Sequence, residues 1–90
     1  MLFMNIITWE PSKRNEIVKR RLEIGIPKGI KVIGEWNDLG GGRSFTLFEA
    51  ADPKGMMAGT LGYSDLMKFE TIPVMETEEV LKLAKGQGKG

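Results

Sequence analysis

Large apolar side chains occupy both alternating positions of every segment that is predicted to form a β-strand. Side chains on a strand point alternately to the two faces of its sheet, so a sheet with one buried face shows apolar and polar residues in alternation. In the first run, Leu2 to Trp9, Met4 and Ile6 point one way whereas Phe3 and Ile7 point the other. Both faces therefore need cover, and the same holds for three further segments: Ile30 to Asp38, Ser44 to Ala50 and Leu66 to Val74.

Helical patterns separate these strands. Apolar residues at near-helical spacing follow Pro11 and end at Gly25, which predicts an amphipathic helix of about 13 residues. Asp52 followed by Pro53 is a typical helix start, although three glycines weaken the segment after it. Thr77 precedes a short last helix that carries four small or apolar residues, namely Val80, Leu81, Leu83 and Ala84.

The element order βαββαβ indicates an α+β, ferredoxin-like fold. It has a four-stranded antiparallel sheet with both crossover helices on one face. Gly40, Gly41 and Gly42 join two strands and predict a hairpin turn, because a phosphate-binding loop of the Walker type would have to open a helix. Ninety residues suffice for one domain, which we predict over residues 1–84. Residues 85–90 are glycine and lysine with one glutamine, which predicts a disordered tail.

Two crossover helices can cover only one face of such a sheet. A bare second face would form an apolar patch larger than soluble monomers tolerate. We therefore predict a homodimer in which two open sheet faces pack together about a twofold axis. The alternative is that the short C-terminal helix folds across the open face.

Several short motifs recur in one order and spacing: Met1-Leu2-Phe3-Met4, Gly34-Glu35-Trp36, Arg43-Ser44-Phe45 with Glu49 and Asp52-Pro53, and Ser64-Asp65-Leu66 with Phe69-Glu70 and Pro73-Val74. Together they resemble an uncharacterised family, domain of unknown function 3303, of the dimeric α/β-barrel superfamily. The resemblance covers most of residues 1–75 and implies the fold and the dimer, but no activity. Tyr63 stands where the family usually has a tryptophan, and Asn5 stands where it usually has an apolar residue.

The composition excludes several classes of chemistry. The chain has no cysteine and no histidine, which rules out disulfides, thiolate or imidazole metal sites and imidazole bases, so we predict neither a metal nor a cofactor. The net charge of +1 gives no support to strong nucleic-acid binding. No segment approaches the ~20 apolar residues of a membrane span, and no secretory signal is present, so we expect a cytoplasmic protein.

The first candidate site residues are an amide and two aromatic side chains. The resemblance implies a cavity of the kind in which cofactor-free monooxygenases of the superfamily hold aromatic substrates. Asn5 could bind a developing oxyanion there, and Trp36 and Tyr63 could orient a ring. The simpler interpretation is that Trp36 belongs to the core and Tyr63 anchors a loop.

Three carboxylates inside predicted strands, Glu35, Glu49 and Glu70, are further candidates for ligand binding. A partly buried carboxylate can act as a base. Strict alternation places Glu35 with Lys31 and Asn37, opposite Ile30, Val32 and Trp36. The alternative is that these glutamates face solvent or pair with Arg43 or Lys68.

An RNA-recognition module is the rival from another class, because it shares the βαββαβ order. Phe3 and Phe45 would then be stacking rings on strands 1 and 3. Leu47 replaces an expected aromatic residue, and the basic residues gather on the first helix instead. The sequence therefore favours a homodimer that binds a small, largely apolar molecule between sheet and helices, with a monooxygenase-like enzyme or an RNA-binding module as alternatives. Whether the protein is an enzyme stays open.

Overall fold

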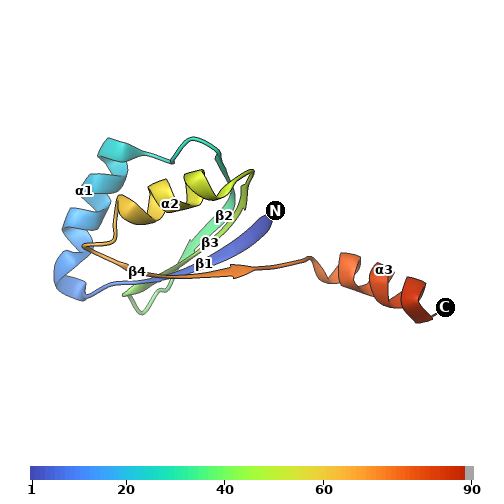
Figure 1. The fold of residues 1–90 in the computed structure, drawn as a ribbon. Helices are drawn as coiled ribbons and strands as arrows, with labels where there is room; N and C mark the ends of the chain where they lie inside the picture. The colour runs from blue at the N-terminus through green and yellow to red at the C-terminus, as the bar shows by residue number, and fades with distance from the viewer. Residues whose placement is uncertain (89–90) are drawn as a thin grey trace.

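The computed structural model, which describes residues 1–88, confirms the α+β fold with a ferredoxin-like arrangement (Figure 1). Its four strands are β1 (Leu2–Thr8), β2 (Ile30–Asn37), β3 (Arg43–Ala50) and β4 (Lys68–Pro73). They pair antiparallel in the order β2-β3-β1-β4. Pro73 ends an edge strand, where its missing N–H leaves no ladder bond unmade.

Helices α1 (Arg14–Ile24) and α2 (Pro53–Leu61) lie together on one face of the sheet (Figure 1). A short 3-10 turn, η1 (Pro11–Lys13), leads into α1, which ends at Gly25 with a φ of 71°. Asp52 caps α2 as predicted, since its carboxylate accepts a hydrogen bond of 2.8 Å from Lys54 N.

The last helix, α3 (Thr77–Gly88), extends away from the sheet (Figure 1). It therefore does not cover the open sheet face, which was the alternative to a dimer. The predicted disordered tail starts at Lys85, whereas α3 continues to Gly88 and includes two glycines. The rest of the predicted tail, residues 89 and 90, lies outside the described residues, and the domain boundary at residue 84 stays a prediction.

A β-bulge in β2 changes which side chains share a face. The pairing with β3 runs Val32 with Phe48 and then Gly34 with Leu47, so Ile33 is the extra residue. Glu35, opposite Thr46, therefore faces the helices like Val32, and Trp36, opposite Phe45, faces away from them. Strict alternation predicted the reverse grouping for these residues, and that grouping is wrong.

The core between sheet and helices is small. The buried apolar residues among those described are Ile7, Phe48, Ala50 and Tyr63, and no large side chain is fully buried. Phe3 stacks on Phe48 with ring centroids 5.5 Å apart. Protein interiors are ordinarily filled by close-packed side chains. Here few side chains are buried, so much of the space between the sheet and the helices is left unfilled.

Candidate functional site

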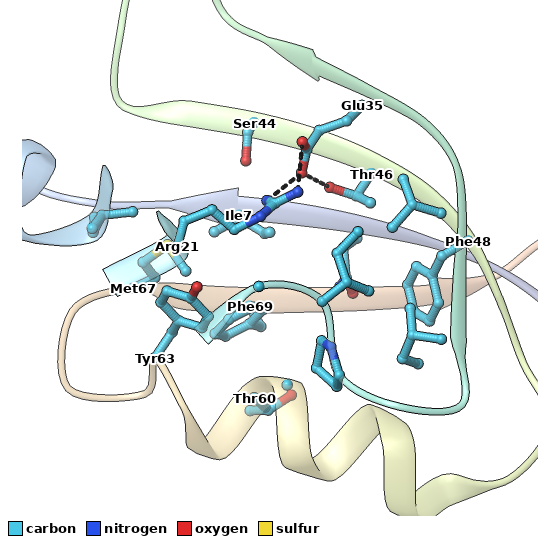
Figure 2. Close-up of a pocket in the computed structure, with 18 of the residues that line it drawn as sticks. Ile7, Arg21, Glu35, Ser44, Thr46, Phe48, Thr60, Tyr63, Met67 and Phe69 are labelled. Atoms are coloured by element: carbon cyan, nitrogen blue, oxygen red, sulfur yellow. Dashed lines mark hydrogen bonds and ion pairs between the residues drawn. The ribbon is translucent and has the colours of Figure 1, made fainter. Parts of the chain in front are cut away.

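A cavity of about 550 Å³ lies between the sheet and the two helices that cover it (Figure 2). The strands contribute alternate residues to its wall, such as Ile7 of β1 and Phe48 of β3. Ile17 of α1 and Met56 of α2 line the opposite side. Exposed side chains such as Leu22 also line the cavity, so it reaches the molecular surface. The volume is within the range of about 300–1,000 Å³ that is typical of small-molecule sites.

One face of α1 forms a whole side of this cavity. Arg14, Ile17, Val18, Arg21 and Leu22 all line it, and their spacing of three and four residues puts them on one helical stripe. Three of these side chains are apolar and two are arginines. α1 therefore presents both apolar surface and positive charge to the cavity.

An ion pair joins α1 to β2 across the cavity wall. Arg21 donates two hydrogen bonds to Glu35, of 2.9 Å to Oε2 and 3.2 Å to Oε1 (Figure 2). Thr46 Oγ1 donates to the same Oε2 at 3.4 Å. The hydrogen bond that Arg21 donates to Glu35 raises the pKa of Arg21 above its ordinary value, so Arg21 stays charged at neutral pH. The positive charge of Arg21 and the negative charge of Glu35 on this part of the wall are thus paired with each other.

A second polar pair lies on β1 and β4. Thr71 Oγ1 donates a hydrogen bond of 2.5 Å to Asn5 Oδ1, and both residues line the cavity. The two residues are direct partners in the antiparallel pairing of their strands. With its oxygen held in this way, the Asn5 amide has its N–H groups left for other partners.

Tyr63 lies in the turn between α2 and β4, and its ring is only 8% exposed. Its backbone is fixed by the turn, since its carbonyl accepts hydrogen bonds from Leu66 N at 2.9 Å and Met67 N at 3.0 Å. The hydroxyl points into the cavity (Figure 2) and has no hydrogen-bond partner among the described residues. Burial raises the pKa of this phenol, so it is a protonated donor at neutral pH.

The structure brings three of the six predicted site residues to the cavity wall. Asn5, Glu35 and Tyr63 line it, and Glu35 pairs with Arg21 rather than with Arg43 or Lys68. The other three lie outside it. Glu49 and Glu70 pair with Leu2 and Ile6 of β1, which places them on the sheet face opposite the helices, and Trp36 shares that face. The role of all six in ligand binding stays a prediction.

Several cavity residues were not predicted as site residues. Arg21 could have been found from the sequence, because it lies four residues after Ile17 on the apolar stripe of its helix. Thr46 and Thr71 carried no such signal. The residues next to them in the strands include both apolar and charged ones and so do not indicate a face. Only the strand register shows that both threonines lie on the sheet face toward the helices.

The aromatic pair of the RNA-binding alternative is not assembled. Phe3 is opposite Phe48 on the side of the helices, whereas Phe45 is opposite Ile6 on the other face. Two rings on opposite faces of a sheet cannot form one stacking platform. The hairpin glycines serve as a turn, as predicted: Gly41 and Gly42 have φ values of 87° and 80°.

Two further observations concern metals and membranes. Within residues 1–88, no group of three or more acidic side chains is placed to hold a metal ion. No helix in that part of the chain is long and apolar enough to span a bilayer.

Comparison with known proteins gives a family but no activity. The family model described as "Domain of unknown function (DUF3303)" matches residues 1–88. No curated protein matches the chain. Among solved structures, a DUF3240 family protein from Shewanella baltica OS155 is 13% identical, with a TM-score of 0.43 over 83% of this chain and 91% of that one. At that level of similarity we draw nothing from it.

Proposed function

This chain belongs to the DUF3303 family, a domain of unknown function, and from its own geometry we propose that it binds a small, largely apolar molecule between sheet and helices. The observation that carries the proposal is the cavity of about 550 Å³ in a domain with four buried apolar residues. The cavity reaches the molecular surface, so water fills it in the free protein. A ligand that binds there must displace this water.

The chemistry of the wall favours an apolar ligand over water. Aliphatic, aromatic and thioether side chains from every element around the cavity make up most of it, among them Val32, Phe48, Met56, Met67 and Phe69. Five of its polar residues bond to one another, namely Arg21 and Thr46 with Glu35, and Asn5 with Thr71. Water in such a space has few partners and is readily displaced by apolar surface.

The proposal includes a homodimer in the cytoplasm, formed through the sheet face that the helices leave open, as in a dimeric α/β barrel. Apolar residues on that face support it: Met4, Ile6, Phe45 and Leu47 are half-buried at its centre, and Trp36 is 54% exposed. The surrounding charges alternate in sign, which lets two copies pair them about a twofold axis. The charged residues in question are Lys31, Arg43, Glu49, Lys68 and Glu70.

Cysteine protection tests where an apolar molecule binds, because the natural chain has no cysteine. Val32 lines the cavity, whereas its neighbour Ile33 is 50% exposed and does not. We expect saturating 2-ethylnaphthalene to slow alkylation of the Val32→Cys variant by iodoacetamide about tenfold. The same probe should leave alkylation of the matched Ile33→Cys variant unchanged.

The reaction rates are read by mass spectrometry over time, and binding to the natural chain is followed by the fluorescence of the probe. Equal rates for Val32→Cys with and without saturating probe would contradict binding in the cavity. So would a failure of the natural chain to bind the probe at any concentration up to its solubility.

A further inference from the structure

Several hydrogen-bonding side chains on the cavity wall already have partners within the protein. Arg21, Glu35 and Thr46 bond to one another, as described above. Thr60 Oγ1 donates to the carbonyl of Met56 in its own helix at 3.1 Å. These groups form their hydrogen bonds within the protein. They therefore give the cavity little selectivity for ligands that carry a polar atom.

Tyr63 is different. Its hydroxyl is the one side-chain polar atom, among those of the described residues, that is fully buried and has no partner. A buried polar group without a hydrogen bond costs free energy, which is why such groups are rare in folded proteins. The ring is held by the α2–β4 turn and the hydroxyl is directed toward the cavity (Figure 2), so a bound molecule reaches it once the side chains that cover it move aside.

We propose that Tyr63 Oη donates a hydrogen bond to an acceptor oxygen of the ligand, and that the cavity therefore selects uncharged apolar molecules that carry a ketone or similar carbonyl group. This inference rests on the proposed function and names the ligand class of the same cavity. Neutral molecules are favoured because Met67 and Phe69, which follow Tyr63 in the chain, give that part of the wall an apolar surface. A carboxylate placed beside Tyr63 would lose its hydration, and Arg21 there is already paired with Glu35, whereas the other cavity arginine, Arg14, is exposed.

Three naphthalene derivatives of similar size test the proposal: 2-ethylnaphthalene, 2-acetylnaphthalene and 2-naphthoate. The natural chain and the Tyr63→Phe variant are titrated with each probe. In the natural chain the ketone should bind most tightly relative to its solubility in water, and the carboxylate most weakly. Tyr63→Phe should weaken ketone binding about fivefold, the size expected for one neutral hydrogen bond, and leave hydrocarbon binding unchanged.

Two measurements separate a hydrogen bond from a structural effect. The infrared stretch of a ¹³C-labelled ketone carbonyl should lie at lower frequency in the natural chain than in Tyr63→Phe. The melting temperature of the free variant should equal or exceed that of the natural chain, since the lost hydroxyl has no protein partner. Ser64→Ala, which removes the exposed neighbouring hydroxyl outside the cavity, should leave all three affinities unchanged.

Each outcome decides between the two proposals. If the ketone and the hydrocarbon both bind and Tyr63→Phe changes their affinities equally, the hydrogen-bond assignment is overturned and the cavity function stands. If the carboxylate binds most tightly, the preference for neutral ligands is overturned. If no probe binds the natural chain, the cavity function itself is overturned, and the assignment of Tyr63 with it.

Discussion

Gly34 provides the space in which the Trp36 indole lies against β2. A Cβ atom at position 34 would be 2.5 Å from Cη2 of Trp36, which is closer than carbon atoms approach without a clash. The ring is 54% exposed on the sheet face that we propose as the dimer interface. Adding a single methyl group at position 34 therefore tests whether the Trp36 indole lies against Gly34.

We expect Gly34→Ala to displace the indole and to shift the emission of Trp36. The displacement is expected because the strand backbone cannot move away while it remains paired with β3 at Leu47. Steady-state fluorescence of Gly34→Ala measures it, and the same change in a Trp36→Phe background serves as the control. An emission spectrum unaffected by Gly34→Ala would contradict this placement of the ring.

At the scale of elements, polar side chains rather than burial attach α1 to the rest of the fold. No residue of α1 is buried, because its inner stripe faces the cavity. Arg20 Nη1 instead donates to the Gly62 carbonyl at 3.2 Å and to Asp65 Oδ1 at 2.5 Å. Lys13 Nζ donates to the Asp65 carbonyl at 3.2 Å. These bonds, from the residue before α1 and from its C-terminal half, fix the helix to the turn that carries Tyr63.

This attachment should depend on pH. The hydrogen bond from Arg20 holds the pKa of Asp65 below its ordinary value, so the pair contributes stability above about pH 4. The contribution is lost as the pH falls through the lowered pKa of the folded state. We expect Asp65→Asn to melt a few degrees below the natural chain at pH 7, with a difference that shrinks steadily below pH 4.

Thermal melts monitored by circular dichroism between pH 2.5 and 7 measure this difference. Glu79→Gln, which removes an exposed ion pair within α3, should have a smaller effect at pH 7 because that pair joins no two elements. A difference for Asp65→Asn that stays constant over the whole pH range would show that the charge of Asp65 does not hold α1.

The sequence was sufficient for the elements and their order, but not for the faces of β2. Apolar periodicity, Gly25 and Asp52 marked the helices, and short glycine-rich joins marked the hairpin. The bulge at Ile33 has no such signal, because its neighbours on both sides are ordinary strand residues. It exchanges the faces of Glu35 and Trp36, and so decides which of these two candidates reaches the cavity.

At the scale of the whole molecule, one chain leaves much apolar surface uncovered. Its radius of gyration is 15.8 Å, against about 12 Å for a compact domain of this length. The excess reflects α3, which extends from the body with Val80, Leu81 and Leu83 exposed (Figure 1). The open sheet face adds a second apolar surface. Both features are typical of a chain that associates.

We expect sedimentation equilibrium at micromolar concentration to give twice the mass of the 10.0 kDa chain. Leu47→Lys places a charge at the centre of the open sheet face and should give a folded monomer. Leu61→Lys, the same change at a 66% exposed leucine of α2, should leave the dimer intact. A natural chain that sediments as a monomer, or a Leu47→Lys variant that stays dimeric, would contradict an interface through this face.

The central claim is that apolar molecules bind between the sheet and the helices. Intermolecular nuclear Overhauser effects between 2-ethylnaphthalene and the methyl groups of the natural chain test it most directly. We predict contacts with Ile7, Ile17 and Met67 inside the cavity, and none with Met4 or Leu47 on the open sheet face. Contacts confined to Met4 and Leu47, or none at saturation, would show that the space between sheet and helices is not a binding site.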